Sequence, residues 1–196
     1  LGNEEISKEE KEKLLKSMDE QLEKVGFILD SMIKSSRLET GLIQLNKVPS
    51  NLFDTIAEAI SGITVKAEKK SIKITVDCPE NYILSHDRKW TAEALFNMLE
   101  NAIKYSFENT KIKVKVQIWE MYTKVDIIDE GIGIPEKDFG KIFQRFFREE
   151  SSYDKEGVGI GLYLSREIIQ KQGGYIKVSS IVGEGSTFSV FLLNDL

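Results

Sequence analysis

The stretch NMLENAIKYS, residues 97–106, decides how the rest of the chain is interpreted. On a helix that turns about 100° per residue, Asn97, Asn101 and Lys104 share one narrow stripe. Amide oxygens are ligands for Mg²⁺ and an ammonium group attracts phosphate, so this stripe is a candidate nucleotide site. The opposite face carries apolar residues that predict a core: Leu95, Leu99, Ala102 and Ile103. For this helix alone, a solvated polar face would be the simpler interpretation.

A second motif, DEGIGIP at residues 129–135, follows a predicted strand. It places Asp129 at the strand end, where a carboxylate accepts a hydrogen bond from the exocyclic amine of adenine. Guanine presents an oxygen at that position and would be repelled. Gly131 and Gly133 would let a base approach the backbone closely. The fragment in isolation also fits an ordinary Asp-Gly turn.

A third motif, GVGIG at residues 157–161, opens a predicted helix. Glycine amides at a helix N-terminus form an anion site, because free N–H groups and the helix dipole both favour phosphate. No parallel βαβ unit precedes the motif, which excludes a dinucleotide-binding Rossmann fold. The polar residues 149–156 before it are typical of a mobile lid over a nucleotide, with a surface loop of no function as the alternative.

The remaining sequence predicts helices interspersed with hairpin-forming strands, which indicates an α+β fold, a two-layer α/β sandwich with helices on one sheet face. Apolar spacing and capping residues predict helices over residues 52–63, 87–105 and 160–172. Alternation predicts strands over residues 72–76, 82–84, 111–119, 122–128, 175–181 and 187–193.

One long helix is expected from residue 7 to about residue 37, since this stretch is rich in Lys, Glu and Leu and lacks proline. Apolar residues at alternating spacings of three and four form a coiled-coil-like seam: Leu15, Met18, Leu22, Val25, Leu29 and Met32. We expect partner helices to cover this seam, the alternative being a helix that packs on its own domain. Residues 1–46 are therefore separated from a globular domain over residues 47–196.

Composition narrows the classes of partner. A net charge of −5 disfavours nucleic acid and anionic membranes, because both need a basic surface. The single cysteine, Cys78, excludes an internal disulfide, and the sequence has no Cys/His cluster for a metal. The apolar runs are too short for a membrane span, so any membrane anchor of the parent protein is expected outside this chain.

Five motifs in order closely resemble the asparagine box, first glycine box, phenylalanine box, second glycine box and last glycine box of sensor histidine kinases. They are NMLENAIKYS (97–106), DEGIGIP (129–135), FQRFFR (143–148), GVGIGL (157–162) and GEGSTF (183–188). The stretch SSRLETGLIQLN also resembles the second helix of the dimerisation hairpin in that family. The resemblance implies a Bergerat-type ATP fold, a mixed sheet backed by helices, with residues 1–46 as a partial dimerisation helix and linker.

The resemblance also implies ATP and Mg²⁺ as cofactors and assigns residues to them. Asn97, Asn101 and Lys104 would be the catalytic residues, with Asn101 as the Mg²⁺ ligand. Lys104 and Tyr105 would contact the phosphates, and Asp129 would anchor adenine.

Further cofactor contacts are implied in the glycine and phenylalanine boxes. Gly157, Gly159 and Gly161 would shape the lid hinge and phosphate site, while Arg145 and Arg148 would contact phosphate or dock the lid. The complete cofactor-binding set is Asn97, Asn101, Lys104, Tyr105, Asp129, Gly131, Gly133, Ile134, Arg145, Arg148, Gly157, Val158, Gly159, Ile160, Gly161, Leu162 and Thr187.

Position 97 separates the candidate activities. Related gyrase-type and chaperone-type ATPases carry a glutamate there to activate water, whereas the amide of Asn97 cannot accept that proton. A protein-histidine kinase that passes the γ-phosphate to a histidine is therefore favoured. The alternatives are an ATPase or serine kinase of the same nucleotide fold, and a non-enzymatic binding module, against which intact Asn101 and Asp129 count.

The acceptor histidine of the family is not recognised in this chain. The only histidine, His86, lies in SHDRKW, which lacks the proline of an acceptor box, and is expected to be a surface or capping residue. The chain is thus expected not to phosphorylate itself. The resemblance further implies relay to a response regulator, a homodimer through the hairpin, and a cytoplasmic location in a membrane-anchored parent.

Overall fold

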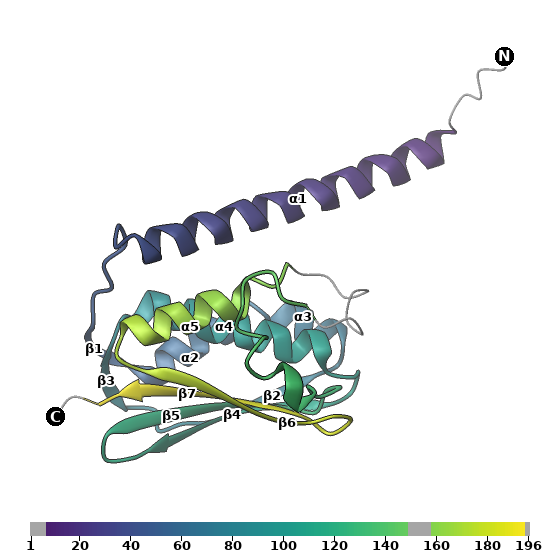
Figure 1. The fold of residues 1–196 in the computed structure, drawn as a ribbon. Helices are drawn as coiled ribbons and strands as arrows, with labels where there is room; N and C mark the ends of the chain where they lie inside the picture. Colours follow the sequence, from purple (N-terminus) through teal and green to yellow (C-terminus); the bar gives the residue numbers. More distant parts are fainter. Residues whose placement is uncertain (1–6, 149–157, 195–196) are drawn as a thin grey trace.

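A five-stranded mixed sheet forms one layer of the protein, in the order β2-β4-β5-β7-β6. The computed structural model describes residues 7–148 and 158–194 (Figure 1). The strands are β2 (Lys73–Asp77), β4 (Lys111–Ile118), β5 (Tyr122–Asp129), β6 (Tyr175–Ile181) and β7 (Gly185–Leu193). β2 pairs with β4 in parallel, and the other three pairings are antiparallel. A separate antiparallel pair joins β1 (Val48–Asn51) to β3 (Ile83–His86).

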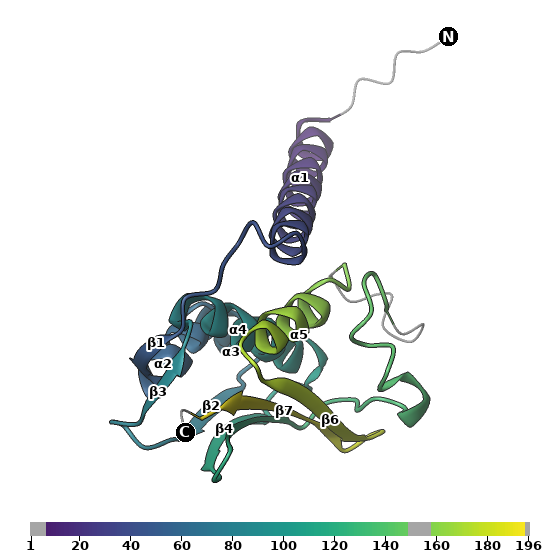
Figure 2. The ribbon, with the colours of Figure 1, turned by 60° about the vertical axis from the view of Figure 1, so that its left-hand side comes forward.

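Helices cover one face of this sheet, as Figures 1 and 2 show from two sides. They are α2 (Leu52–Ser61), α3 (Thr64–Lys69), α4 (Arg88–Tyr105) and α5 (Gly161–Lys171), with a short 3₁₀ turn η1 (Glu136–Asp138). The core lies between the layers, where Met98 of α4 and Ile168 of α5 are fully buried with Ile127 of β5 and Val190 of β7. The predicted α+β two-layer sandwich is confirmed.

Helix α4 begins where the sequence predicted. Asp87 is its N-cap, and its Oδ1 accepts a hydrogen bond of 3.1 Å from the Trp90 N–H. Its Oδ2 accepts a second bond of 2.8 Å from the Asn46 N–H. The predicted core face is also confirmed, because Leu95 and Leu99 are each 1% exposed.

Strand β7 begins earlier than predicted. Expected from residue 187, it begins at Gly185, and Ser186 pairs with Asp129 of β5. Gly185 has a φ of +125°, and a Cβ there would lie 2.0 Å from the Asp129 carbonyl oxygen. Only glycine fits this close approach, so Gly185 belongs to the strand although its sequence context is typical of a turn. The short elements β1 and α3 were also not predicted, since four and six residues carry little periodicity.

Helix α1 (Lys8–Glu39) projects from the two-layer body (Figure 1). Ser7 and Glu10 form a capping box, in which each side chain accepts a hydrogen bond from the other residue's N–H. The seam residues Leu15 to Met32 are 45–67% exposed, whereas Leu38 at the C-terminal end is fully buried. Among the described residues, the last turns of α1 therefore pack on the body. No helix in the described ranges is long and apolar enough to cross a bilayer.

Candidate functional site

The polar stripe of α4 meets the N-terminus of α5. Helix α5 starts at Gly161 without a side-chain cap, and a Cβ at Gly161 would lie 3.5 Å from the Asn97 side chain. Asn97 is only 5% exposed, and within the described residues its Nδ2 has no hydrogen-bond partner. A buried donor left unpaired costs about 1–3 kcal/mol. This unpaired amide beside a helix N-terminus fits a bound polar group such as phosphate.

The stripe continues along α4 to its last turn. Asn101 follows Asn97 by one turn and is half-buried, as are Lys104 and Tyr105. The Lys104 Nζ lies 4.7 Å from the centre of the Tyr105 ring. An amide oxygen, a cation and an aromatic ring therefore line the same side of one helix.

Asp129 ends β5 as a buried carboxyl group that is 6% exposed. Its Oδ1 accepts hydrogen bonds from the N–H groups of Gly131 at 2.9 Å and Ser186 at 3.2 Å. Burial raises the pKa of Asp129 to about 6, although these two hydrogen bonds act to lower it. Neither bond uses Oδ2, so at neutral pH the carboxylate offers a second, strongly accepting oxygen to a ligand donor.

Glycines in the motifs are required by the protein's own backbone. A Cβ at Gly133, where φ is +71°, would lie 2.2 Å from the Ile181 carbonyl oxygen. A Cβ at Gly159, where φ is +75°, would lie 2.5 Å from the Phe147 carbonyl oxygen. These two glycines let neighbouring segments approach closely, which is a structural use beyond the predicted access for a ligand.

Arg145 contacts helix α1. It forms a salt bridge with Glu39 of α1 and donates a hydrogen bond of 3.3 Å to Ser35 Oγ. Its guanidinium also lies 4.6 Å from the centre of the Tyr163 ring of α5, and the Tyr163 hydroxyl donates to Glu39 at 2.8 Å. Arg145 thus joins the phenylalanine-box segment and α5 to the N-terminal helix.

The fold is that of a known family. Residues 86–195 match the family of histidine kinase-, DNA gyrase B- and HSP90-like ATPases, which is more than half of the chain. The chain belongs to this family.

Two curated relatives place this ATPase domain more closely. The alginate biosynthesis sensor protein KinB of Pseudomonas aeruginosa is 29% identical over 180 residues, covering 91% of the chain and 30% of KinB. The signal transduction histidine-protein kinase ArlS of Staphylococcus aureus is 44% identical over 94 residues, covering 47% of the chain and 21% of ArlS. The domain is thus a catalytic domain of the bacterial sensor histidine kinase type, and it spans less than one third of these relatives.

A solved structure has the same fold along nearly the whole chain. Full-length ShkA, crystallised in complex with AMPPNP, superposes with a TM-score of 0.80 at 18% identity. The likeness covers 98% of this chain and 40% of ShkA. It therefore includes helix α1 as well as the two-layer body.

The ATPase domain brings the predicted residues into two groups. Asn97, Asn101 and Lys104 lie with Gly161 along α4 and at the start of α5, while Asp129, Gly131 and Gly133 lie at the end of β5. The other predicted residues in the described ranges are half-buried or buried: Ile134, Arg148, Val158, Gly159, Ile160, Leu162 and Thr187. Gly157 and the predicted lid at 149–156 lie outside the described residues.

His86 is not the surface or capping residue that the sequence suggested. It ends β3 and is 1% exposed, with Nδ1 donating to the Leu84 carbonyl oxygen at 2.8 Å and Nε2 lying 2.8 Å from Thr55 Oγ1. Burial lowers its pKa, which favours the neutral ring. Its surroundings come from α2 and β3, which SHDRKW alone does not reveal.

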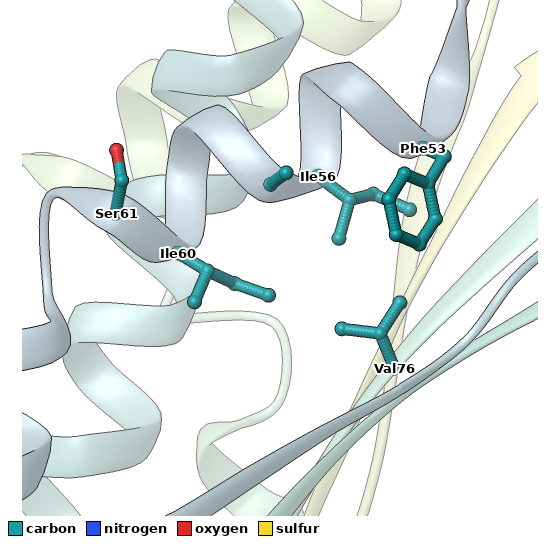
Figure 3. A pocket seen from close by; sticks show the side chains of 6 residues that line it. Phe53, Ile56, Ile60, Ser61 and Val76 are labelled. Carbon is teal, nitrogen blue, oxygen red and sulfur yellow. The ribbon is translucent and has the colours of Figure 1, made fainter. Parts of the chain in front are cut away.

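An apolar groove of about 350 Å³ lies between α2 and β2 (Figure 3). Side chains of α2 face Val76 of β2 across it, and Ser61 lies at one end. None of its lining residues belongs to the predicted cofactor set. With almost no polar lining, the groove does not supply the contacts that a nucleotide phosphate needs.

Two serines near Asp129 were missed by sequence reasoning. Ser186 donates its N–H to the Asp129 carboxylate, and the Ser180 hydroxyl accepts a hydrogen bond of 2.8 Å from the Ile134 N–H. Ser186 lies in GEGSTF, so the last glycine box was the available signal. Ser180 has no motif around it and is recognised only through the hairpin that brings β6 beside the 129–135 loop.

Proposed function

We propose that this domain binds ATP with Mg²⁺ and transfers the γ-phosphate to a histidine on a dimerisation-hairpin helix, for relay to a response regulator. The observation that carries the proposal is the buried Asn97 amide, without a partner among the described residues, beside the uncapped start of α5. The AMPPNP complex of ShkA, which shares the fold, supports a nucleotide as the ligand.

The base is recognised by Asp129. Its Oδ1 is held by two backbone N–H groups, so Oδ2 accepts the exocyclic amine of adenine. Guanine would place a carbonyl oxygen against that carboxylate, which is repulsive. The 129–133 loop is thereby the adenine-selective part of the site.

The phosphates lie along α4 and the start of α5. The first N–H groups of α5 and the Lys104 ammonium provide positive charge, and Asn101 supplies an amide oxygen for Mg²⁺. When bound, Mg²⁺ neutralises the charge that develops on the transferring phosphoryl group. The residues of the chain would position the triphosphate.

Transfer to a histidine is favoured over hydrolysis because Asn97 cannot act as a general base for water. His86 does not serve as acceptor, since its ring is buried and both nitrogens are engaged. The exposed seam of α1 supports a partner helix from a hairpin and a second subunit. Residues 1–46 then belong to the dimerisation region, and residues 47–196 to a cytoplasmic catalytic domain of a membrane-anchored parent.

Titration calorimetry tests the nucleotide site. Asp129→Ala is expected to lose ATP binding with or without Mg²⁺, while Asn101→Ala loses mainly the Mg²⁺-dependent part. The unaltered domain is expected to bind ATP more tightly than GTP. Equal affinity for both nucleotides would contradict the role of Asp129.

Radiolabelled ATP tests the transfer step. The chain alone is expected to acquire no acid-labile label, whereas an added hairpin with an exposed histidine is expected to be labelled. Loss of that label in acid identifies it as phosphohistidine. Asn97→Asp, which introduces a carboxylate that can act as a general base for water, is expected to increase the release of inorganic phosphate. Acid-labile label on this chain that disappears in His86→Ala would show that His86 is the acceptor.

A further inference from the structure

One side chain outside the motifs caps the C-terminus of α4. The Lys70 ammonium donates hydrogen bonds to the carbonyl oxygens of Ile103 at 2.8 Å, Lys104 at 3.0 Å and Ser106 at 3.0 Å. Carbonyls in the last turn of a helix lack partners within the helix and carry partial negative charge. A single ammonium with three donors satisfies them together and complements the helix dipole.

The last turn of α4 is also attached to the loop of residues 129–133, here called the adenine loop of the proposed site. The Tyr105 carbonyl oxygen accepts a hydrogen bond of 3.3 Å from the Ile132 N–H, and Ser106 forms a β-bridge with Gly131. A Cβ at Gly131 would lie 2.7 Å from the Tyr105 carbonyl oxygen, so the two backbones are in close contact. A shift of this turn would therefore move the loop that begins at Asp129.

The backbone around Lys70 is held by its own contacts. Lys70 is the C-cap residue that follows α3, and its carbonyl oxygen accepts a hydrogen bond of 3.0 Å from the Asn109 N–H. Ser71 and Asn109 have positive φ values of 55° and 62°, which turn the chain tightly on both sides of this bond. Lys70 therefore reaches α4 from a backbone anchored to the segment that follows α4.

We propose that Lys70 is a positioning residue for the nucleotide site, an inference that rests on the proposed ATP-binding function. Through three carbonyl groups it holds the last turn of α4, which carries Lys104 and Tyr105. Through the bond between Tyr105 and Ile132 it also holds the adenine loop. Lys70 itself contacts no nucleotide; its capping fixes the relative place of the phosphate and adenine contacts.

The test compares Lys70 with its neighbour Lys69, which is exposed. Lys70→Met keeps the aliphatic stem and removes the donors, and it is expected to raise the Kd for Mg²⁺-AMPPNP about tenfold. Lys70→Arg retains charge and donors and is expected to stay within about threefold of wild type. Lys69→Met, which changes the same net charge, is expected to bind as wild type does.

Hydrogen exchange of the nucleotide-free domain gives a second readout. The Ile132 amide is expected to exchange faster in Lys70→Met, while the Ile127 amide in the centre of β5 exchanges at the wild-type rate. If Lys70→Met does not fold, Lys70→Gln, which keeps donors without the charge, replaces it in both measurements.

Two results would overturn the inference in different ways. The first is a Lys70→Met variant with a lower melting temperature but with the AMPPNP affinity and Ile132 exchange rate of wild type. This result would show that Lys70 stabilises α4 without positioning the nucleotide contacts. Absence of AMPPNP binding by the wild type itself would refute the proposed function, and with it the nucleotide role of Lys70.

Discussion

At the scale of single residues, Asp129 couples the nucleotide site to pH. Its folded-state pKa is raised to about 6, above the ordinary value of 3.8, because burial disfavours the charged form. Between about pH 4 and pH 6 the folded state therefore binds more protons than the unfolded state, and stability falls as the pH rises. Above pH 6 this contribution is constant and unfavourable.

Asp129→Asn should remove that penalty. An amide keeps an oxygen for the N–H groups of Gly131 and Ser186 but does not ionise. The free energy of unfolding of the variant, relative to wild type, is expected to increase by roughly 2 kcal/mol between pH 4 and pH 7. Denaturant unfolding at several pH values measures this difference, and a difference independent of pH would contradict the raised pKa.

The same substitution should alter base preference. With its oxygen held by the two backbone N–H groups, the amide side chain introduced by Asp129→Asn would present an NH₂ group where Oδ2 stood. A donor there repels the adenine amine and matches the guanine oxygen. The ratio of GTP to ATP affinity, measured by competition, is expected to increase at least about tenfold, equivalent to about 1.4 kcal/mol. An unchanged ratio would place base recognition elsewhere.

At the scale of elements, the contact between α4 and the start of α5 forms the phosphate end of the proposed site. A Cβ at Gly161 would meet Asn97 at 3.5 Å, an ordinary contact, whereas one at Gly159 would meet backbone at 2.5 Å. Gly161 is therefore not required by packing. Its lack of a side chain leaves space beside the first N–H groups of α5 and the Asn97 side chain.

Gly161→Ala is expected to fold normally and to bind ATP about tenfold more weakly, a loss of about 1.4 kcal/mol. The added methyl stands between the α5 N-terminus and Asn97. Thermal denaturation and calorimetry separate the two effects. Gly140→Ala is the control, because a Cβ there meets no atom within 4 Å. A lower melting temperature together with weaker ATP binding in Gly161→Ala would indicate a packing role for Gly161 instead.

At the scale of the whole molecule, the described contacts attach α1 to the catalytic body at its C-terminal end. Leu38 is buried, Lys34 Nζ bonds Glu93 of α4 at 2.9 Å, and Glu39 pairs with Arg145. The Glu39 and Arg145 side chains are 35% and 43% exposed, so their pairing contributes only about 0.5–1 kcal/mol. The described contacts that orient α1 are thus few and modest.

Exchanging the charges of this pair tests the attachment. Glu39→Arg and Arg145→Glu, each alone, are expected to broaden the distribution of distances between spin labels on α1 and on the β6–β7 turn. The double exchange restores the attraction and should narrow it again. Double electron–electron resonance with labels at positions 16 and 184, and Cys78 replaced by serine, measures this. Distance distributions in both single variants as narrow as in wild type would mean that the contacts of Leu38 and Lys34 are sufficient to orient α1.

The order of the longer helices and strands, the two-layer class and the motif residues could be predicted from the amino-acid sequence, because these depend on local periodicity and capping. Asp87 as the N-cap of α4 and the bounds of β6 follow from residues within a few positions of one another. The identity of Asn97 alone already argued against a general base.

Which of these residues are buried, paired or without a partner in the described ranges depends on the tertiary structure. The unsatisfied Asn97 amide, the raised pKa of Asp129 and the enclosed His86 ring arise from neighbours on other elements. Lys70 caps carbonyls more than 30 positions away, and Arg145 reaches a helix more than 100 positions earlier. Desolvation and hydrogen bonding act between atoms that folding brings together, and no local pattern in the chain records those distances.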